Sequence, residues 1–140
     1  MTIRFAAVSG LVLAGALSAF PAAAQDGALG AEIYQERCAV CHGENGAGDG
    51  VVGQLFARTP KDLRQLTNDN DGVFPFVQVY KSIDGRADIT GHGPANMPVW
   101  GEFFMEQAVY DPRINEKDAK YVTAGRILSV IRFLETIQAE

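Results

Sequence analysis

The sequence predicts an all-α domain of four or five short helices. Apolar residues recur at the spacing of a helix near residue 30 and again beyond residue 115. Glycine- and proline-rich stretches separate the helical segments, and the one short β-branched run has no neighbouring run with which it could pair as a strand. We therefore expect helices that bury their apolar faces against one another.

Residues 1–24 have the pattern of a secretory signal peptide. Arg4 supplies a positive charge, residues 5–20 are almost wholly apolar, and the alanines at 22–24 fit a cleavage site. The alternative is an uncleaved anchor, but the apolar run is short for a membrane span of about 20 residues. We expect cleavage at the end of this segment, a mature domain of residues 25–140, a periplasmic location and no stable membrane insertion.

The mature domain is acidic and has no internal repeat or long linker. The whole chain carries a formal net charge of −5, and loss of Arg4 with the leader changes this to −6. Such a surface disfavours nucleic acid and anionic lipid as partners. We expect one small domain whose partner proteins present a basic or neutral docking face.

The first helix, predicted over Leu29–Cys38, leads into the motif Cys38-Ala39-Val40-Cys41-His42. Two thiols three residues apart lie on one side of a helical turn, so both can form thioethers with a porphyrin while His42 binds its iron. The C-x-x-C-H pattern is far more restrictive than C-x-x-C and predicts one covalently attached haem c. The alternatives are a disulfide, two buried thiols, or a redox-active dithiol, which would require a preceding strand.

The segments after the motif predict a loop and two short helices. Glycine density marks Gly43–Gly50 as a loop that leaves room for a flat cofactor, and it lacks the Gly-Lys-Ser/Thr pattern of a phosphate-binding loop. A short helix is expected from Pro60 to Leu66, with Thr59 as its N-cap. A second helix is expected over Pro75–Ile83.

A methionine stands in the Gly- and Pro-rich stretch Gly91–Gly101, which is expected to be irregular. The thioether of Met97, held in a rigid loop, can supply the second axial ligand of a haem iron, with core packing as its alternative role. His92 competes for the same position, although an exposed place in the loop is favoured for it. Met105 and Trp100 are expected to pack against their neighbours or, for Trp100, against the haem edge.

The last part of the chain predicts the longest helix. Glu102–Pro112 is expected to be a partly helical connection, and Asn115 is the expected N-cap of the helix that follows. Its apolar stripe is expected to contain Tyr121, Gly125, Leu128, Ile131, Phe133, Leu134 and Ile137. We expect the first helix to cover this stripe.

The order helix, C-x-x-C-H, loops, loop methionine and long final helix resembles the class I c-type cytochromes, in their single-haem bacterial form. The resemblance covers essentially the whole mature chain. It implies a class I cytochrome c fold wrapped around one haem, with thioethers on Cys38 and Cys41. It also implies His42 as the proximal and Met97 as the distal iron ligand.

The same resemblance implies how the first and last helices pack. The family places a glycine and an aromatic residue at this crossing, which here are Gly30 and Tyr34, and the opposite surface is expected to contain Val130, Phe133 and Leu134. In many relatives a proline carbonyl accepts the Nδ1 proton of the proximal histidine. Pro60 is the candidate in this chain, at a longer spacing than usual.

These expectations together predict electron transfer. A haem with both axial positions filled by protein has no open site and cycles between Fe(III) and Fe(II). We expect a soluble electron carrier, or the electron-transfer subunit of an exported dehydrogenase, with no catalytic residues and with redox-partner proteins docked transiently. The alternatives are a haem-based sensor or enzyme with a labile Met97, and a thiol–disulfide oxidoreductase that uses Cys38 and Cys41.

Overall fold

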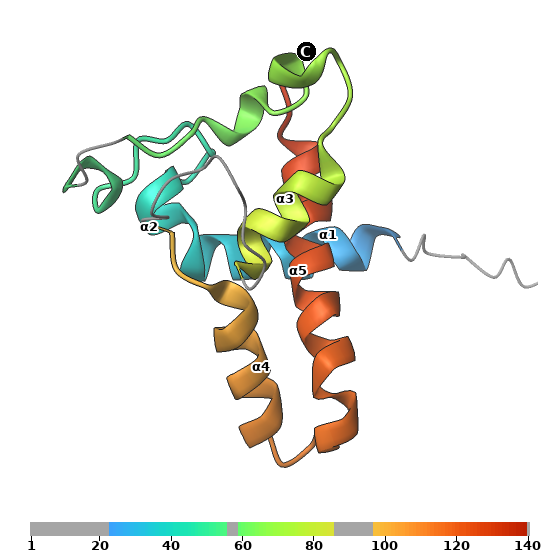
Figure 1. Ribbon diagram of the computed structural model, residues 1–140. Coiled ribbons are helices and arrows are strands. Elements are labelled where there is room, and N and C mark those ends of the chain that lie inside the picture. The colour runs from blue at the N-terminus through green and yellow to red at the C-terminus, as the bar shows by residue number, and fades with distance from the viewer. Residues whose placement is uncertain (1–22, 56–58, 86–96, 140) are drawn as a thin grey trace, which may run out of the picture.

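The computed structural model describes residues 23–55, 59–85 and 97–139, and within these ranges every regular element is a helix (Figure 1). The α-helices are α1 (Ala23–Arg37), α2 (Ala39–His42), α3 (Phe76–Asp84), α4 (Trp100–Tyr110) and α5 (Ala119–Thr136). Single 3-10 turns cover Gly53–Leu55, Leu63–Gln65, Asn68–Asn70 and Glu116–Asp118. The all-α prediction is confirmed, and α5 is the longest described helix at 18 residues.

In the described ranges, no helix combines the length and the apolar character that crossing a membrane requires.

The centre of the fold is the crossing of α1 and α5, which Figure 1 shows in the middle of the molecule. Tyr34 of α1 is fully buried there, and its ring centroid lies 4.9 Å from that of Phe133. Val130 and Leu134 are buried in the same core. The packing implied by the family resemblance is therefore found, with Gly30 facing the backbone of α5.

The buried face of α5 differs from the expected stripe. Tyr121 is 67% exposed, Leu128 is 40% exposed and Gly125 is also exposed, so the assignment of these three residues to the stripe was wrong. The helix instead buries Ala119, Thr123, Ile127, Ser129, Val130, Ile131 and Leu134. Thr123 can lie in this core because its hydroxyl donates a hydrogen bond of 2.9 Å to the Ala119 carbonyl, which satisfies it within the helix.

The expected partly helical connection after Met97 is a complete helix, α4. Phe104 and Ala108, four residues apart, are buried on its inner side against α5. The two helices run antiparallel and are joined by a turn that contains Asn115 (Figure 1). The Asn115 side chain accepts a hydrogen bond of 3.0 Å from the Lys117 amide, so the predicted cap is confirmed at a 3-10 turn that leads into α5.

The predicted helix over Pro60–Leu66 was wrong in extent and in its cap. Its helical part is the single turn Leu63–Gln65, capped by the Asp62 carboxylate rather than by Thr59. The Leu63 amide donates to the Gly46 carbonyl at 2.7 Å, which holds the preceding backbone out of a helix. The helix expected over Pro75–Ile83 is confirmed as α3, which ends at Asp84 and is capped by Gly85 with φ of 65°.

Part of the methionine segment can also be compared with the structure. Residues 86–96, including His92, lie outside the described residues, so the role of His92 stays a prediction. Residues 97–99 are irregular, as expected, but Trp100 and Gly101 already belong to α4.

Candidate haem site

The cysteine motif forms one tight turn directly after α1. The Cys38 amide still completes a helical bond to the Tyr34 carbonyl, at 2.8 Å. The Cys38 carbonyl then accepts from the amides of both Cys41 and His42, at 3.1 and 2.9 Å. The two thiols and the imidazole therefore belong to a single rigid turn, which is the arrangement that attachment to one porphyrin edge requires.

The Cys38 thiol lies in an apolar environment. It packs against the hydrophobic core, and burial, together with the nearby Cys41 thiol, raises its pKa to about 12. Redox-active dithiols have the opposite property, because their attacking cysteine needs a lowered pKa to exist as thiolate. The environment of Cys38 therefore disfavours the thiol–disulfide alternative.

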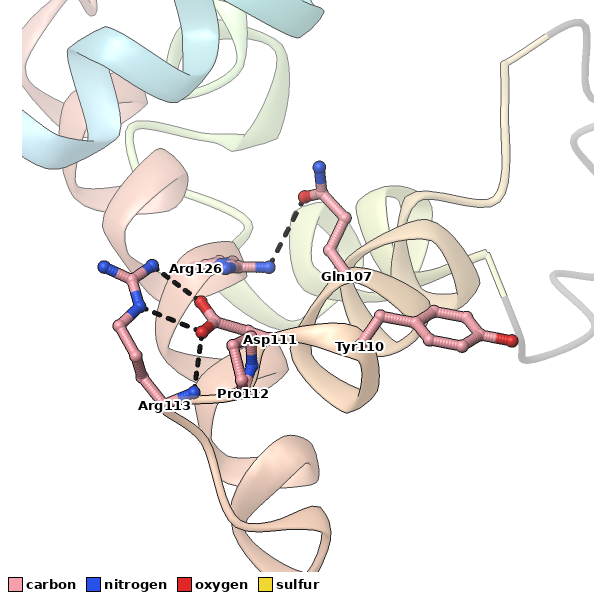
Figure 2. Close-up of a pocket in the computed structure, with 6 residues that line it drawn as sticks. All are labelled: Gln107, Tyr110, Asp111, Pro112, Arg113 and Arg126. Carbon is pink, nitrogen blue, oxygen red and sulfur yellow. Dashed lines mark hydrogen bonds and ion pairs between the residues drawn. The ribbon is translucent and has the colours of Figure 1, made fainter.

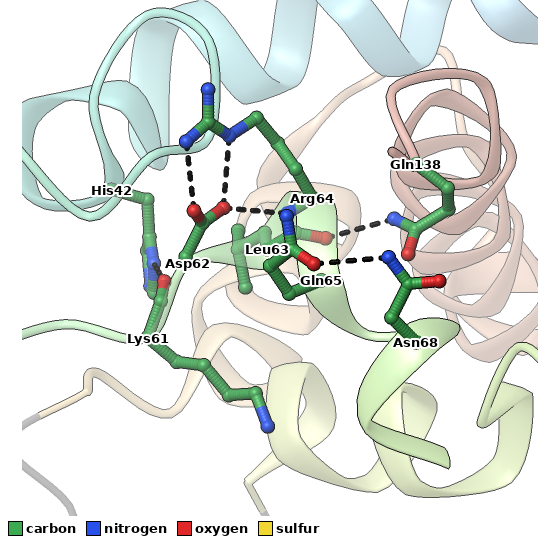
Figure 3. A network of polar contacts seen from close by, with 8 residues as sticks. All are labelled: His42, Lys61, Asp62, Leu63, Arg64, Gln65, Asn68 and Gln138. Atoms are coloured by element: carbon green, nitrogen blue, oxygen red, sulfur yellow. Dashed lines mark hydrogen bonds and ion pairs between the residues drawn. The ribbon is translucent and has the colours of Figure 1, made fainter. Parts of the chain in front are cut away.

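The His42 ring is half-buried and oriented by a backbone carbonyl. Its Nδ1 lies 3.2 Å from the carbonyl oxygen of Lys61 (Figure 3). Burial lowers the pKa of His42, which favours the neutral ring that metal binding requires. With its proton on Nδ1 directed to this carbonyl, the ring has Nε2 available for iron.

The acceptor is Lys61 and not the proline before it, so the Pro60 assignment was wrong by one residue. The Pro60 carbonyl instead faces Gly48, where a Cβ atom would overlap it. A backbone carbonyl is present at every residue, so the sequence contains no signal that distinguishes Lys61 from its neighbours.

The glycine loop after the motif packs against the motif's own backbone. A Cβ atom at Gly50 would lie 2.5 Å from the Cys41 carbonyl carbon, and Gly48 has φ of 81°. The Gly48 amide also donates to the His42 carbonyl at 2.8 Å. These glycines permit a close approach between chain segments and thereby fix the orientation of the motif, a reason that differs from the expected room for a flat cofactor.

Met97 lies on the same apolar cluster as Cys38. Its side chain is half-buried against the core, and the partly buried residues of this cluster include Ala39, Phe76, Tyr80 and Trp100. Trp100 itself packs edge-on against Phe103, with ring centroids 5.5 Å apart, which agrees with the packing role expected for it. Met105 also packs as expected, because its sulfur lies 3.9 Å from the Thr123 hydroxyl between α4 and α5.

A separate hollow lies at the turn between α4 and α5 (Figure 2). Its cationic groups already have partners: Arg113 forms a bidentate pair with Asp111, and Arg126 donates to the side chain of Gln107 at 3.4 Å. The Arg113 charge is therefore paired with a carboxylate, whereas Arg126 bonds to neutral oxygen acceptors.

In the described residues, an all-helical fold in which a C-x-x-C-H turn holds an imidazole oriented by a backbone carbonyl is typical of a c-type cytochrome. Residues 25–111 match the family model described as "Cytochrome C oxidase, cbb3-type, subunit III", which covers more than half of the chain. The chain belongs to this family. Neither the curated proteins nor the solved structures include a match to the chain.

Membership establishes the cofactor and the general activity. The chain binds haem c covalently and transfers electrons to and from redox-partner proteins through the Fe(III)/Fe(II) couple that the haem supplies. The residues of the motif fit this cofactor, because two thiols and an imidazole share one turn.

Proposed function

We propose that this protein is a periplasmic electron carrier whose haem iron is bound axially by His42 and Met97. The observation that carries the proposal is the orientation of His42, whose Nδ1 faces the Lys61 carbonyl at 3.2 Å. This carbonyl fixes the ring and makes its other nitrogen a stronger donor to the metal. The position of Met97 beside the cluster that also contains Cys38 supports it as the opposite ligand.

The apolar surroundings suit a group that changes only its oxidation state. Phe76, Tyr80 and Trp100 pack against the core together with Cys38 and Met97. Such side chains exclude water, so little solvent has to reorganise when the charge of the site changes. A ligand set supplied entirely by protein also leaves no position for a substrate, which favours electron transfer over ligand binding.

An exposed apolar patch next to the motif supports transient docking there. The patch consists of Val40, Val51 and Leu55, whose exposed fractions are 45%, 76% and 82%. A hydrogen bond of 3.0 Å from the Val52 amide to the Val40 carbonyl places its parts side by side. Because the mature chain has a net charge of −6, we propose a partner with a basic or neutral face around this patch.

The predicted signal peptide supports the periplasm as the location, since c-type haem is attached outside the cytoplasm. The matching family is named for an oxidase subunit, and the sequence also suggested a subunit of an exported dehydrogenase. Gentle purification distinguishes the two forms of the proposal: a free carrier elutes alone, whereas a subunit elutes in a stable complex.

The ferric absorption spectrum tests the axial ligands. Thioether ligation gives a weak red band, which we expect in the parent protein and in His92→Ala but not in Met97→Ala. Persistence of the band in Met97→Ala would refute Met97 as ligand. Rapid binding of carbon monoxide by the reduced parent protein at neutral pH would instead support a sensor or enzyme with a labile Met97.

A further inference from the structure

The carbonyl that orients His42 belongs to a segment with several anchors. Lys61 is followed by the turn Leu63–Gln65, whose first amide donates to the Gly46 carbonyl at 2.7 Å. Gly46 lies in the loop directly after the cysteine motif. The segment is therefore held on one side by the loop that also fixes His42.

The other side of this segment is held by the end of α5. The Gln138 amide nitrogen donates to the Leu63 carbonyl at 2.8 Å (Figure 3). It also donates to the Leu134 carbonyl at 2.7 Å, and the Gln138 side-chain oxygen accepts from the Thr67 amide at 2.9 Å. Two of these bonds thus join Gln138, just after the end of α5, to residues that are 71 and 75 positions away in the sequence. Both donor hydrogens of the Gln138 amide are used.

The turn between these anchors and Lys61 is stiff. The Asp62 carboxylate accepts from the Arg64 amide at 2.9 Å and from two guanidinium nitrogens of Arg64 at 2.9 and 2.8 Å. A bidentate pair of this kind fixes geometry as well as distance. The Asp62–Arg64 pair therefore restricts the backbone on both sides of Leu63, next to Lys61.

We propose that Gln138 is a positioning residue for the proximal histidine and thereby sets the reduction potential of the haem. Its side-chain amide, together with the bond of 2.8 Å from the Ala139 amide to the Arg64 carbonyl, holds the Leu63–Thr67 segment so that the Lys61 carbonyl lies within hydrogen-bond distance of His42 Nδ1. That hydrogen bond raises the basicity of the imidazole, which stabilises Fe(III) relative to Fe(II). This inference rests on the proposed ligation by His42.

The test uses the haem-loaded protein with Gln138→Met, which keeps the length and neutrality of the side chain but removes its hydrogen bonds, and with Gln138→Ala. We expect the midpoint potential of the haem to rise by about 28 mV in both variants. At 59 mV per tenfold, this rise corresponds to a change of about threefold in the equilibrium constant between Fe(III) and Fe(II). We also expect the His42 Nδ1 proton of the reduced protein to exchange about threefold faster with solvent, measured by NMR with labelled histidine.

A structural control separates positioning from stability. Ile127→Val removes one methylene from the buried face of α5, far along the helix from Gln138, and should lower stability without changing the potential or the proton exchange. The inference is overturned if Gln138→Met lowers stability but leaves both of those quantities at parent values. Absence of haem-shifted His42 resonances from the parent protein would refute the ligation itself, which is a separate outcome.

Discussion

Gly30 of α1 lies directly against the carbonyl group of Ser129 in α5. A Cβ atom at Gly30 would overlap the Ser129 oxygen, and it would lie 2.5 Å from the carbonyl carbon. One turn further along α1, the hydroxyl of buried Tyr34 donates to the Gly43 carbonyl at 2.7 Å, next to His42. The contact between these two helix backbones therefore determines where α1 delivers the haem motif.

We expect Gly30→Ala to destabilise the haem-loaded protein by about 3 kcal/mol, because the added methyl group forces the two backbones apart. Urea unfolding measures the change. Gly125→Ala is the matched control, since a Cβ atom at this glycine of α5 meets no atom within 4 Å. It should stabilise the protein by up to about 1 kcal/mol through helix propensity, and equal losses in the two variants would contradict the account of the crossing.

The features that the sequence predicted correctly share a local or repeating cause. The C-x-x-C-H turn needs only five consecutive residues, and α3 and α5 follow from apolar spacing along a few helical turns. Asn115 was identified as a cap because its side chain bonds to an amide two residues away. Gly30 and Tyr34 came from the family resemblance, and the structure places both at the crossing.

Two of the features that were wrong depend on contacts between distant segments. The helix expected from Pro60 is interrupted because Leu63 bonds to Gly46, and the acceptor for His42 is a backbone oxygen with no sequence signature. Tyr121 was placed in the core by its apolar character, yet the core position near it is taken by Thr123. The Thr123 hydroxyl donates its hydrogen bond within α5, which residue polarity alone does not reveal.

The ion pair between Asp111 and Arg113, in the turn after α4, makes part of the folding stability sensitive to acid pH. Hydrogen bonds from the Arg113 side chain and amide lower the pKa of Asp111 to about 2. The contribution of a depressed carboxylate is present above its unfolded pKa of about 3.9 and is lost as the pH falls through its folded value. We expect Asp111→Asn to lower the unfolding temperature at pH 7 and to lose less stability than the parent between about pH 4 and about pH 2.

Thermal unfolding followed by circular dichroism across this pH range measures the effect. Asp118→Asn provides the control, because the Asp118 side chain makes no capping hydrogen bond at the start of α5. The interpretation fails if Asp111→Asn and the parent lose the same stability in the acid range.

The exposed patch of Val40, Val51 and Leu55 should control the rate of reaction with the partner. We expect the double change Val51→Ser and Leu55→Ser to lower the second-order rate constant about fivefold, a loss of about 1 kcal/mol of docking energy. Stopped-flow mixing with the purified redox partner provides the measurement. Tyr121→Ser removes a large side chain of α5 that is 67% exposed and should leave the rate unchanged. Equal slowing by Tyr121→Ser would place docking elsewhere.

The intact mass of the protein, produced in a host that exports it and attaches c-type haem, tests the central claim most directly. We predict a single species with the mass of residues 25–140 plus one haem that denaturation does not remove, and loss of that haem in the double variant Cys38→Ser, Cys41→Ser. A mature chain without added haem and with two titratable thiols would contradict the account.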